Sequence, residues 1–204
     1  MRLQSEPNRF TEAEYLAIER VAPFKCEFYR GEMFAMAGGS PMHSLIAGNL
    51  IRVLGNRLQG RGCLTFTSDL RVKVEMTGLI TYPDVSVVCG ELRFADAEQD
   101  TLINPTLVAE VLSDTTEGYD RGEKFAHFRR VASLQAYLLL SQRKPAIELF
   151  LRAEDGQWSL REAAGMEASL GIPPLHVTLP LGEVFANVTF LQAAPRTVLG
   201  SAAK

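Results

Sequence analysis

One stretch of the chain, residues 105–112, consists of apolar or small residues around a single acid, Glu110. Its short length and its Leu, Val and Ala content predict a buried strand. A carboxylate in such a strand loses its hydration, so it needs a metal ion, a cation or a hydrogen-bond donor as a partner. A second acid, Asp84, follows Pro83 at the start of another apolar run, residues 83–89. The fold of this chain therefore has to supply partners for two acids on its strands.

Hydrophobic periodicity predicts an α/β fold. Apolar residues at helical spacing predict helices over residues 11–20, 41–60 and 120–131. The acidic, poorly periodic segment 91–104 predicts a surface connection, and Asp155-Gly156 predicts a hairpin turn. Strand patterns cover two short runs within residues 25–36, then 63–67, 70–74, 83–89, 105–112, 136–140, 147–151 and 157–161. Together these elements predict a central mixed sheet flanked by helices, with an added antiparallel hairpin.

Composition limits the domain organisation and the compartment. A chain of 204 residues that is 47% hydrophobic fits one domain, predicted here over residues 1–192, followed by a flexible tail over 193–204. Cys26, Cys63 and Cys89 are an odd number at wide spacings, which predicts reduced thiols. No apolar signal segment or membrane-length stretch is visible, so we expect a cytoplasmic protein with no membrane partner.

The charge balance argues against one class of function. A net charge of −3 is unlike that of a protein that coats nucleic acid through a positive field. Two predicted helices still carry groups of basic residues, which could form a local basic face or simply solvated helix surfaces. These residues are Arg52, Arg57 and Arg61 on the first, and Arg121, Lys124, Arg129 and Arg130 on the second.

The acids predict a magnesium site. Mg²⁺ prefers oxygen ligands and keeps several waters, so two carboxylates and a backbone carbonyl suffice as protein ligands. Asp84, Glu110 and the carbonyl of Val111 are the predicted ligands, with Mn²⁺ as an alternative ion. Lys124 would orient the attacking water or hold the scissile phosphate through its positive charge. Such a site can hydrolyse a phosphodiester.

The same residues resemble the pattern of a known family. Glu27, Pro83-Asp84, the run 110–113 and the run 120–124 followed by Phe128 are similar to the Uma family of restriction-endonuclease-like proteins, within the PD-(D/E)XK nuclease superfamily. The segment 26–32 and His43 also resemble the N-terminal pattern of that family, so the resemblance extends from about residue 11 to residue 190.

The resemblance implies a restriction-endonuclease-like fold and a Mg²⁺-dependent endonuclease that acts on DNA. It implies metal binding by Asp84 and Glu110, a supporting acid at Glu27 and a catalytic lysine. Leu112 occupies the position where the (D/E)XK triplet has lysine, so the resemblance places the lysine on the following helix, at Lys124. By analogy, cutting both strands of a duplex suggests a homodimer.

Each candidate residue also has a simpler interpretation. Asp84 could cap a strand or turn, Glu110 could form only a salt bridge, and Lys124 could pair with Asp120 on a helix surface. Glu27 could lie on an exposed strand face, and His43 could be a packing or capping residue. Two other functions therefore stay open: an inactive nucleic-acid-binding or structural member of the fold, and a hydrolase of another phosphoester.

Overall fold

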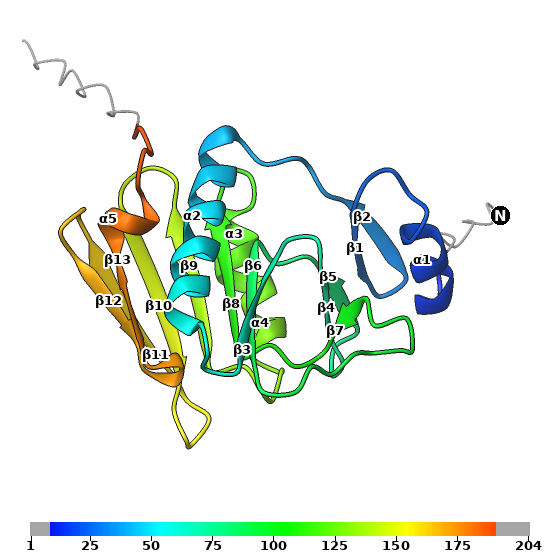
Figure 1. Cartoon of the computed structure of the whole chain (residues 1–204). Helices are drawn as coiled ribbons and strands as arrows, with labels where there is room; N and C mark the ends of the chain where they lie inside the picture. Colours follow the sequence, from blue (N-terminus) through cyan, green and yellow to red (C-terminus); the bar gives the residue numbers. More distant parts are fainter. Residues whose placement is uncertain (1–8, 191–204) are drawn as a thin grey trace, which may run out of the picture.

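A six-stranded mixed sheet forms the centre of the computed structural model, which describes residues 9–190 (Figure 1). Its strand order is β11-β10-β9-β8-β6-β3, and only β8 and β9 run parallel. The strands are β3 (Cys63–Thr67), β6 (Val85–Cys89), β8 (Leu107–Leu112), β9 (Ala136–Ser141), β10 (Ala146–Arg152) and β11 (Trp158–Ala164). The predicted mixed sheet is thereby confirmed.

A second sheet of five strands lies beside the first, toward the α1 end of the molecule (Figure 1). Its order is β2-β1-β5-β4-β7, and helix α1 (Glu12–Glu19) packs against it through Tyr15, which stacks on Phe28. The strands are β1 (Cys26–Tyr29), β2 (Glu32–Ala35), β4 (Arg71–Val74), β5 (Leu79–Thr81) and β7 (Thr101–Leu102). The chain passes from this sheet to the central one between β5 and β6, where Asp84 lies.

One face of the central sheet is covered by α2 (Pro41–Leu58), which crosses in front of it in Figure 1. Ser40 caps this helix by accepting a hydrogen bond from the His43 N–H, and Pro41 occupies its first turn. The apolar side of α2 packs on Val85, Ala109 and neighbouring inward residues. The same face receives a second hairpin, β12 (Ser169–Ile172) and β13 (Val177–Pro180), the 3₁₀ turn Pro173–Leu175 between them, and the short helix α5 (Leu181–Val184).

The opposite face carries the other helical layer. A single helical segment runs through α3 (Glu117–Tyr119), a π-helical turn (Asp120–Lys124) and α4 (Phe125–Phe128). Phe125 and Phe128 pack against Tyr137 and belong to one apolar cluster with Val108 and Leu112 of β8. Because side chains alternate along a strand, Glu110 shares this face with Val108 and Leu112. The acid is thus directed toward the helix that carries Lys124.

Three details differ from the expectations from sequence. The strands divide into two large sheets, and the chain crosses between these sheets several times before β8, once at residues 82–84. The segment 91–104 contains β7, which pairs in parallel with β4 and whose two residues are fully buried. The expected helix over 120–131 starts earlier, at Glu117, ends at Phe128, and contains a π-helical turn over Asp120–Lys124.

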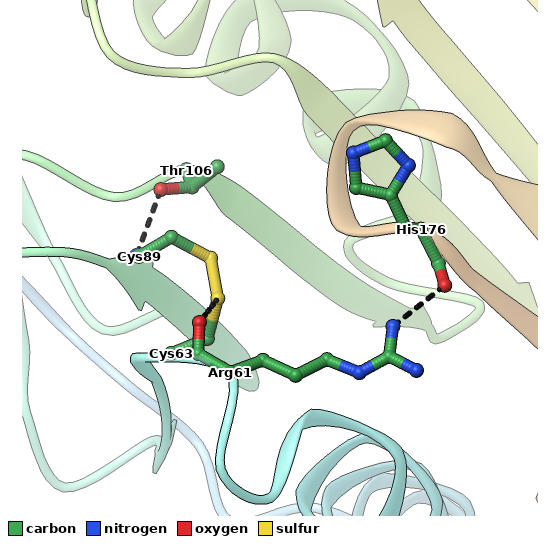
Figure 2. Close-up of a disulfide and its surroundings, with 5 residues drawn as sticks. All are labelled: Arg61, Cys63, Cys89, Thr106 and His176. Carbon is green, nitrogen blue, oxygen red and sulfur yellow. Dashed lines mark hydrogen bonds between the residues drawn. A yellow bond between two sulfur atoms is a disulfide. The ribbon is translucent and has the colours of Figure 1, made fainter.

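The cysteine prediction was wrong, because Cys63 and Cys89 form a disulfide (Figure 2). They lie directly opposite each other on the antiparallel strands β3 and β6, with 4.0 Å between their Cα atoms. The flanking hydrogen bond from the Gly90 N–H to the Gly62 carbonyl makes this a non-hydrogen-bonded pair, the position where antiparallel strands approach closest. Cys26 keeps a free, buried thiol.

The chain-end and membrane predictions have different outcomes. The predicted tail, residues 193–204, lies outside residues 9–190, and the single-domain boundary at 192 stays a prediction. Among the helices in the described part of the chain, none is long and apolar enough to cross a bilayer.

Candidate active site

Asp84 and Glu110 lie side by side on neighbouring strands. In the pairing of β6 with β8, Val85 is opposite Ala109, and the next step of this register places Asp84 opposite Glu110. Opposite residues on paired strands project from the same face of the sheet. The Glu110 side chain is only 4% exposed and that of Asp84 is 16% exposed. The two acids singled out from sequence therefore meet at a largely buried point.

Asp84 is held through one carboxylate oxygen. Its Oδ2 accepts a hydrogen bond from the Val111 N–H at 2.7 Å and lies 3.0 Å from Nε2 of His43. The first contact ties the residue to β8, and the second ties it to the first turn of α2. The contact between His43 and Asp84 was not part of the simpler interpretation of either residue.

Lys124 reaches the acids from the π-helical turn. Its Nζ lies 2.9 Å from Oε1 of Glu110, 3.6 Å from Oε1 of Glu27 and 3.7 Å from Oδ1 of Asp120. The lysine side chain is 5% exposed, so the expected pairing with Asp120 is present but does not lie on a helix surface. Tyr137 Oη donates to the carbonyl of Asp120, the first residue of this turn, at 2.9 Å. Single π turns inside helices occur frequently at functional sites.

Glu27 comes from the other sheet. Its Oε1 accepts from the Thr81 hydroxyl, and its Oε2 accepts from Tyr119 Oη at 3.1 Å. Its side chain is 13% exposed, so it does not lie on a solvated strand face. The cluster therefore assembles from both sheets and from the helical segment between α3 and α4.

Negative charge exceeds positive charge in this cluster. Burial, with the charges of Asp84 and Asp120, raises the pKa of Glu110 well above its usual range, although Lys124 acts in the opposite direction. Burial likewise raises the pKa of Asp120. Burial disfavours the charged form of Lys124, but the attraction of Glu110, Glu27 and Asp120 is larger and raises its pKa. The raised pKa of Lys124 indicates that the surrounding acids stabilise positive charge at this position.

The oxygen donors of this cluster are of the type that a hard divalent cation prefers. Three carboxylates, on Glu27, Glu110 and Asp120, lie within 4 Å of the Lys124 ammonium, and Asp84 lies opposite Glu110 with His43 beside it. Oε1 of Glu110 is buried and forms no hydrogen bond within residues 9–190, although it faces the Lys124 ammonium. The described residues contain no group of three metal-type side chains in binding position. A divalent cation at this place would therefore have at most two carboxylate ligands and would need carbonyl oxygen and water to complete its shell.

The structure explains the departure at Leu112. The side chain of Leu112 is 5% exposed and packs in the apolar cluster with Phe125 and Val108. The Lys124 ammonium instead lies beside Glu110 on the same face of β8. Placement of the lysine on the following helix is therefore compatible with the geometry, while the catalytic roles of these residues remain predictions.

Asp120, Tyr119 and Thr81 were not assigned to the site from sequence. The four-residue spacing of Asp120 and Lys124 was the available signal for the first, but it was interpreted as a helix-surface pair. Tyr119 and Thr81 contact Glu27 through hydroxyl groups, which carry no sequence signature. Only the meeting of the two sheets brings them to the acids.

The expected basic helix faces are largely occupied by internal contacts. Arg57 pairs with Glu183, and Arg52 donates to the Glu183 carbonyl, so both attach α2 to α5. Arg61 donates to the carbonyl of His176 at 2.9 Å (Figure 2). Arg121 pairs with Glu117 and Glu148. The side chains of these four arginines therefore form contacts within the protein.

Comparison with known proteins agrees with the resemblance. The Uma2 family, described as "Putative restriction endonuclease", matches residues 12–182. The uncharacterized protein sll1609 of Synechocystis sp. is 38% identical over 160 residues, covering 78% of this chain and 90% of that protein. A second uncharacterized Synechocystis protein, slr1290, is 40% identical over 146 residues, covering 71% of this chain and 75% of the relative.

A solved structure shares the fold. A "putative nuclease belonging to DUF820" from Anabaena variabilis superposes with a TM-score of 0.66 at 18% identity, covering 85% of this chain and 96% of that one. The central mixed sheet with its flanking helices is therefore a restriction-endonuclease-like fold. By its sequence match over most of its length, this chain belongs to the Uma2 family.

Proposed function

We propose that this protein is a Mg²⁺-dependent endonuclease that hydrolyses phosphodiester bonds of DNA, with Mn²⁺ as an alternative ion. The observation that carries the proposal is the cluster itself: Asp84 opposite Glu110, with the Lys124 ammonium 2.9 Å from the latter. The description of the Uma2 family as a restriction endonuclease supports the choice of DNA.

Asp84, Glu110 and the Val111 carbonyl are the proposed metal ligands. Oδ2 of Asp84 is engaged by two donors, while Oδ1 has no hydrogen-bond or ion-pair partner within the described residues. The Val111 N–H is directed toward Asp84, and the N–H and C=O of one strand residue point to the same edge, so its carbonyl faces the same side. A bound Mg²⁺ would activate water and neutralise charge on the phosphate.

Lys124 and Glu27 have separate proposed roles. The Lys124 ammonium lies next to a ligand oxygen, where it can hold the attacking water or a phosphate oxygen. Glu27 lies 3.6 Å from the same ammonium and is fixed by Tyr119 and Thr81. It would therefore set the position of the lysine amine rather than take part in the bond cleavage.

Cutting both strands of a duplex usually takes two such centres. A homodimer would supply them, since each chain contributes one cluster. We therefore propose a two-fold dimer as the form that cuts both strands, and sedimentation of the protein with and without DNA would test it. A monomer that makes only single-strand nicks would contradict the dimer and leave the phosphodiesterase proposal in place.

The test of the activity uses supercoiled plasmid with Mg²⁺, Mn²⁺ or chelator. We expect cleavage by the wild type only with metal, and losses of at least about 100-fold in Asp84→Asn, Glu110→Gln and Lys124→Met. Glu167→Gln is the matched control, because Glu167 is exposed and lies on the turn before β12. Equal cleavage by Asp84→Asn and the wild type, or cleavage that persists in chelator, would contradict the proposal.

The same experiment separates the two alternatives. An inactive DNA-binding protein would retard DNA on a gel with no cleavage under any metal. A hydrolase of another phosphoester would leave plasmid intact but cleave a small phosphodiester such as bis(p-nitrophenyl) phosphate, with loss in Asp84→Asn.

A further inference from the structure

His43 contacts the acid that the sequence pattern assigns to metal binding. Its Nε2 lies 3.0 Å from Oδ2 of Asp84, the same oxygen that accepts from the Val111 N–H. Two donors on one carboxylate oxygen fix the rotation of the carboxylate plane. They also direct the other oxygen, Oδ1, away from both donors and leave it available.

The His43 ring is seated against a glycine. A Cβ atom placed on Gly39 would lie 2.7 Å from Nδ1 and 3.0 Å from Cγ of the ring, far inside normal contact distance. Gly39 does not adopt a left-handed backbone conformation, so the chain needs glycine there for this close approach alone. The adjacent Gly38 would place a Cβ in open space.

A hydrogen-bond relay fixes the start of α2 relative to β8. Ser40 Oγ accepts from the His43 N–H at 3.1 Å and donates to Oε1 of Gln142 at 2.7 Å. Gln142 Nε2 donates to the carbonyl of Leu112, the last residue of β8, at 2.8 Å. The helix turn that carries His43 is thereby tied to the strand that carries Glu110.

We propose that His43, seated on Gly39 and tied to β8 through Ser40 and Gln142, is the positioning residue that aims Oδ1 of Asp84 at the metal site. The proposal rests on the proposed function for the identity of the bound ion. It also explains the glycine at position 39, because a Cβ atom there would meet the His43 ring. Groups that orient metal ligands typically affect metal affinity by about 10- to 100-fold.

The experiment measures Mn²⁺ affinity of the full chain by calorimetry. We expect His43→Leu and Gly39→Ala each to weaken binding by about 10- to 100-fold. His43→Gln retains an N–H donor near the position of Nε2 and should recover most of the affinity. Gly38→Ala is the matched control and should bind as the wild type. Thermal unfolding without metal checks that each variant is folded.

The outcomes separate this proposal from the proposed function. Wild-type binding with unchanged affinity in His43→Leu and Gly39→Ala would overturn the role of His43 and leave the metal site standing. No Mn²⁺ binding by the wild type would contradict the metal site itself. Where the variants do not fold, ¹⁵N spectra of the imidazole decide: His43 ring signals that do not change in Asp84→Asn overturn the proposal.

Discussion

Replacing Lys124 by methionine tests whether the buried acids need a cation. Methionine has nearly the length of the lysine stem, so the substitution removes charge while it conserves most of the packing. The acids on Glu110, Glu27 and Asp120 would lose the one lysine that lies within 4 Å of each of them. The fold would then hold several buried carboxylates without compensation.

The expected destabilisation follows from the distances. At 2.9 Å from Glu110, the Coulomb attraction at an effective dielectric constant of 20 is about 6 kcal/mol. Desolvation offsets part of it, and removing one partner of a buried pair costs about 3–5 kcal/mol in the free energy of unfolding. For a chain of this size that corresponds to a decrease of about 10 °C in the melting temperature.

Calorimetric melting at several pH values and metal concentrations is the assay. Without Lys124 the pKa of Glu110 is raised further, so the folded state binds more protons than the unfolded state, and stability should decrease as the pH rises from 5 to 8. Millimolar Mg²⁺ or Mn²⁺ should restore part of the stability at pH 8, because it supplies the missing charge.

Lys73→Met is the matched control, since Lys73 forms an ion pair with Glu12 whose acid is 38% exposed. That pair should contribute less than about 1 kcal/mol. A Lys124→Met protein that melts like Lys73→Met at every pH would refute the account of the cluster as an over-acidic site.

Three further predictions concern the fold. Reduction of the Cys63–Cys89 disulfide, or its removal in a Cys63→Ser/Cys89→Ser variant, should destabilise the fold. For a separation of 26 residues, the free energy of unfolding measured in urea should decrease by about 3–4 kcal/mol. Equal urea midpoints with and without the disulfide would contradict this prediction. Burial lowers the pKa of His127, so this group destabilises the fold as the pH falls from 7 to 5, and the stability of the wild type relative to His127→Phe should decrease over that range in pH-dependent urea titrations. Leu138→Ala, in the core of β9, should cost about 2–5 kcal/mol, whereas Leu160→Ala, 49% exposed on β11, should change stability by less than about 1 kcal/mol in the same titration.

Local sequence patterns were sufficient to predict features that lie within a single helix or strand. The apolar spacing in residues 41–60 predicted α2, and Ile46, Leu50, Val53, Leu54 and Leu58 are indeed its buried residues. The apolar run around Glu110 predicted a strand, and all six residues of β8 are buried. Glu110 was recognisable as unusual because the apolar residues around it exclude water from its carboxylate.

Features that depend on pairing between distant segments were not predictable. Cys63 and Cys89 are 26 residues apart, and only the register of β3 against β6 shows that they face each other. The π turn that brings Lys124 to Glu110 has no simple periodicity. The contact of His43 with Asp84 depends on how α2 crosses the sheet, which no local pattern specifies.

The origin of the acids in two separate sheets has a consequence for how the protein could fail. Glu27 belongs to the five-stranded sheet and Glu110 to the six-stranded one, and Lys124 contacts both. Any fluctuation that parts the sheets would break up the carboxylate cluster while each sheet kept its own hydrogen bonds. The carboxylate cluster is therefore intact only while the two sheets are packed together. Heat or denaturant should disrupt the cluster before the central sheet unfolds.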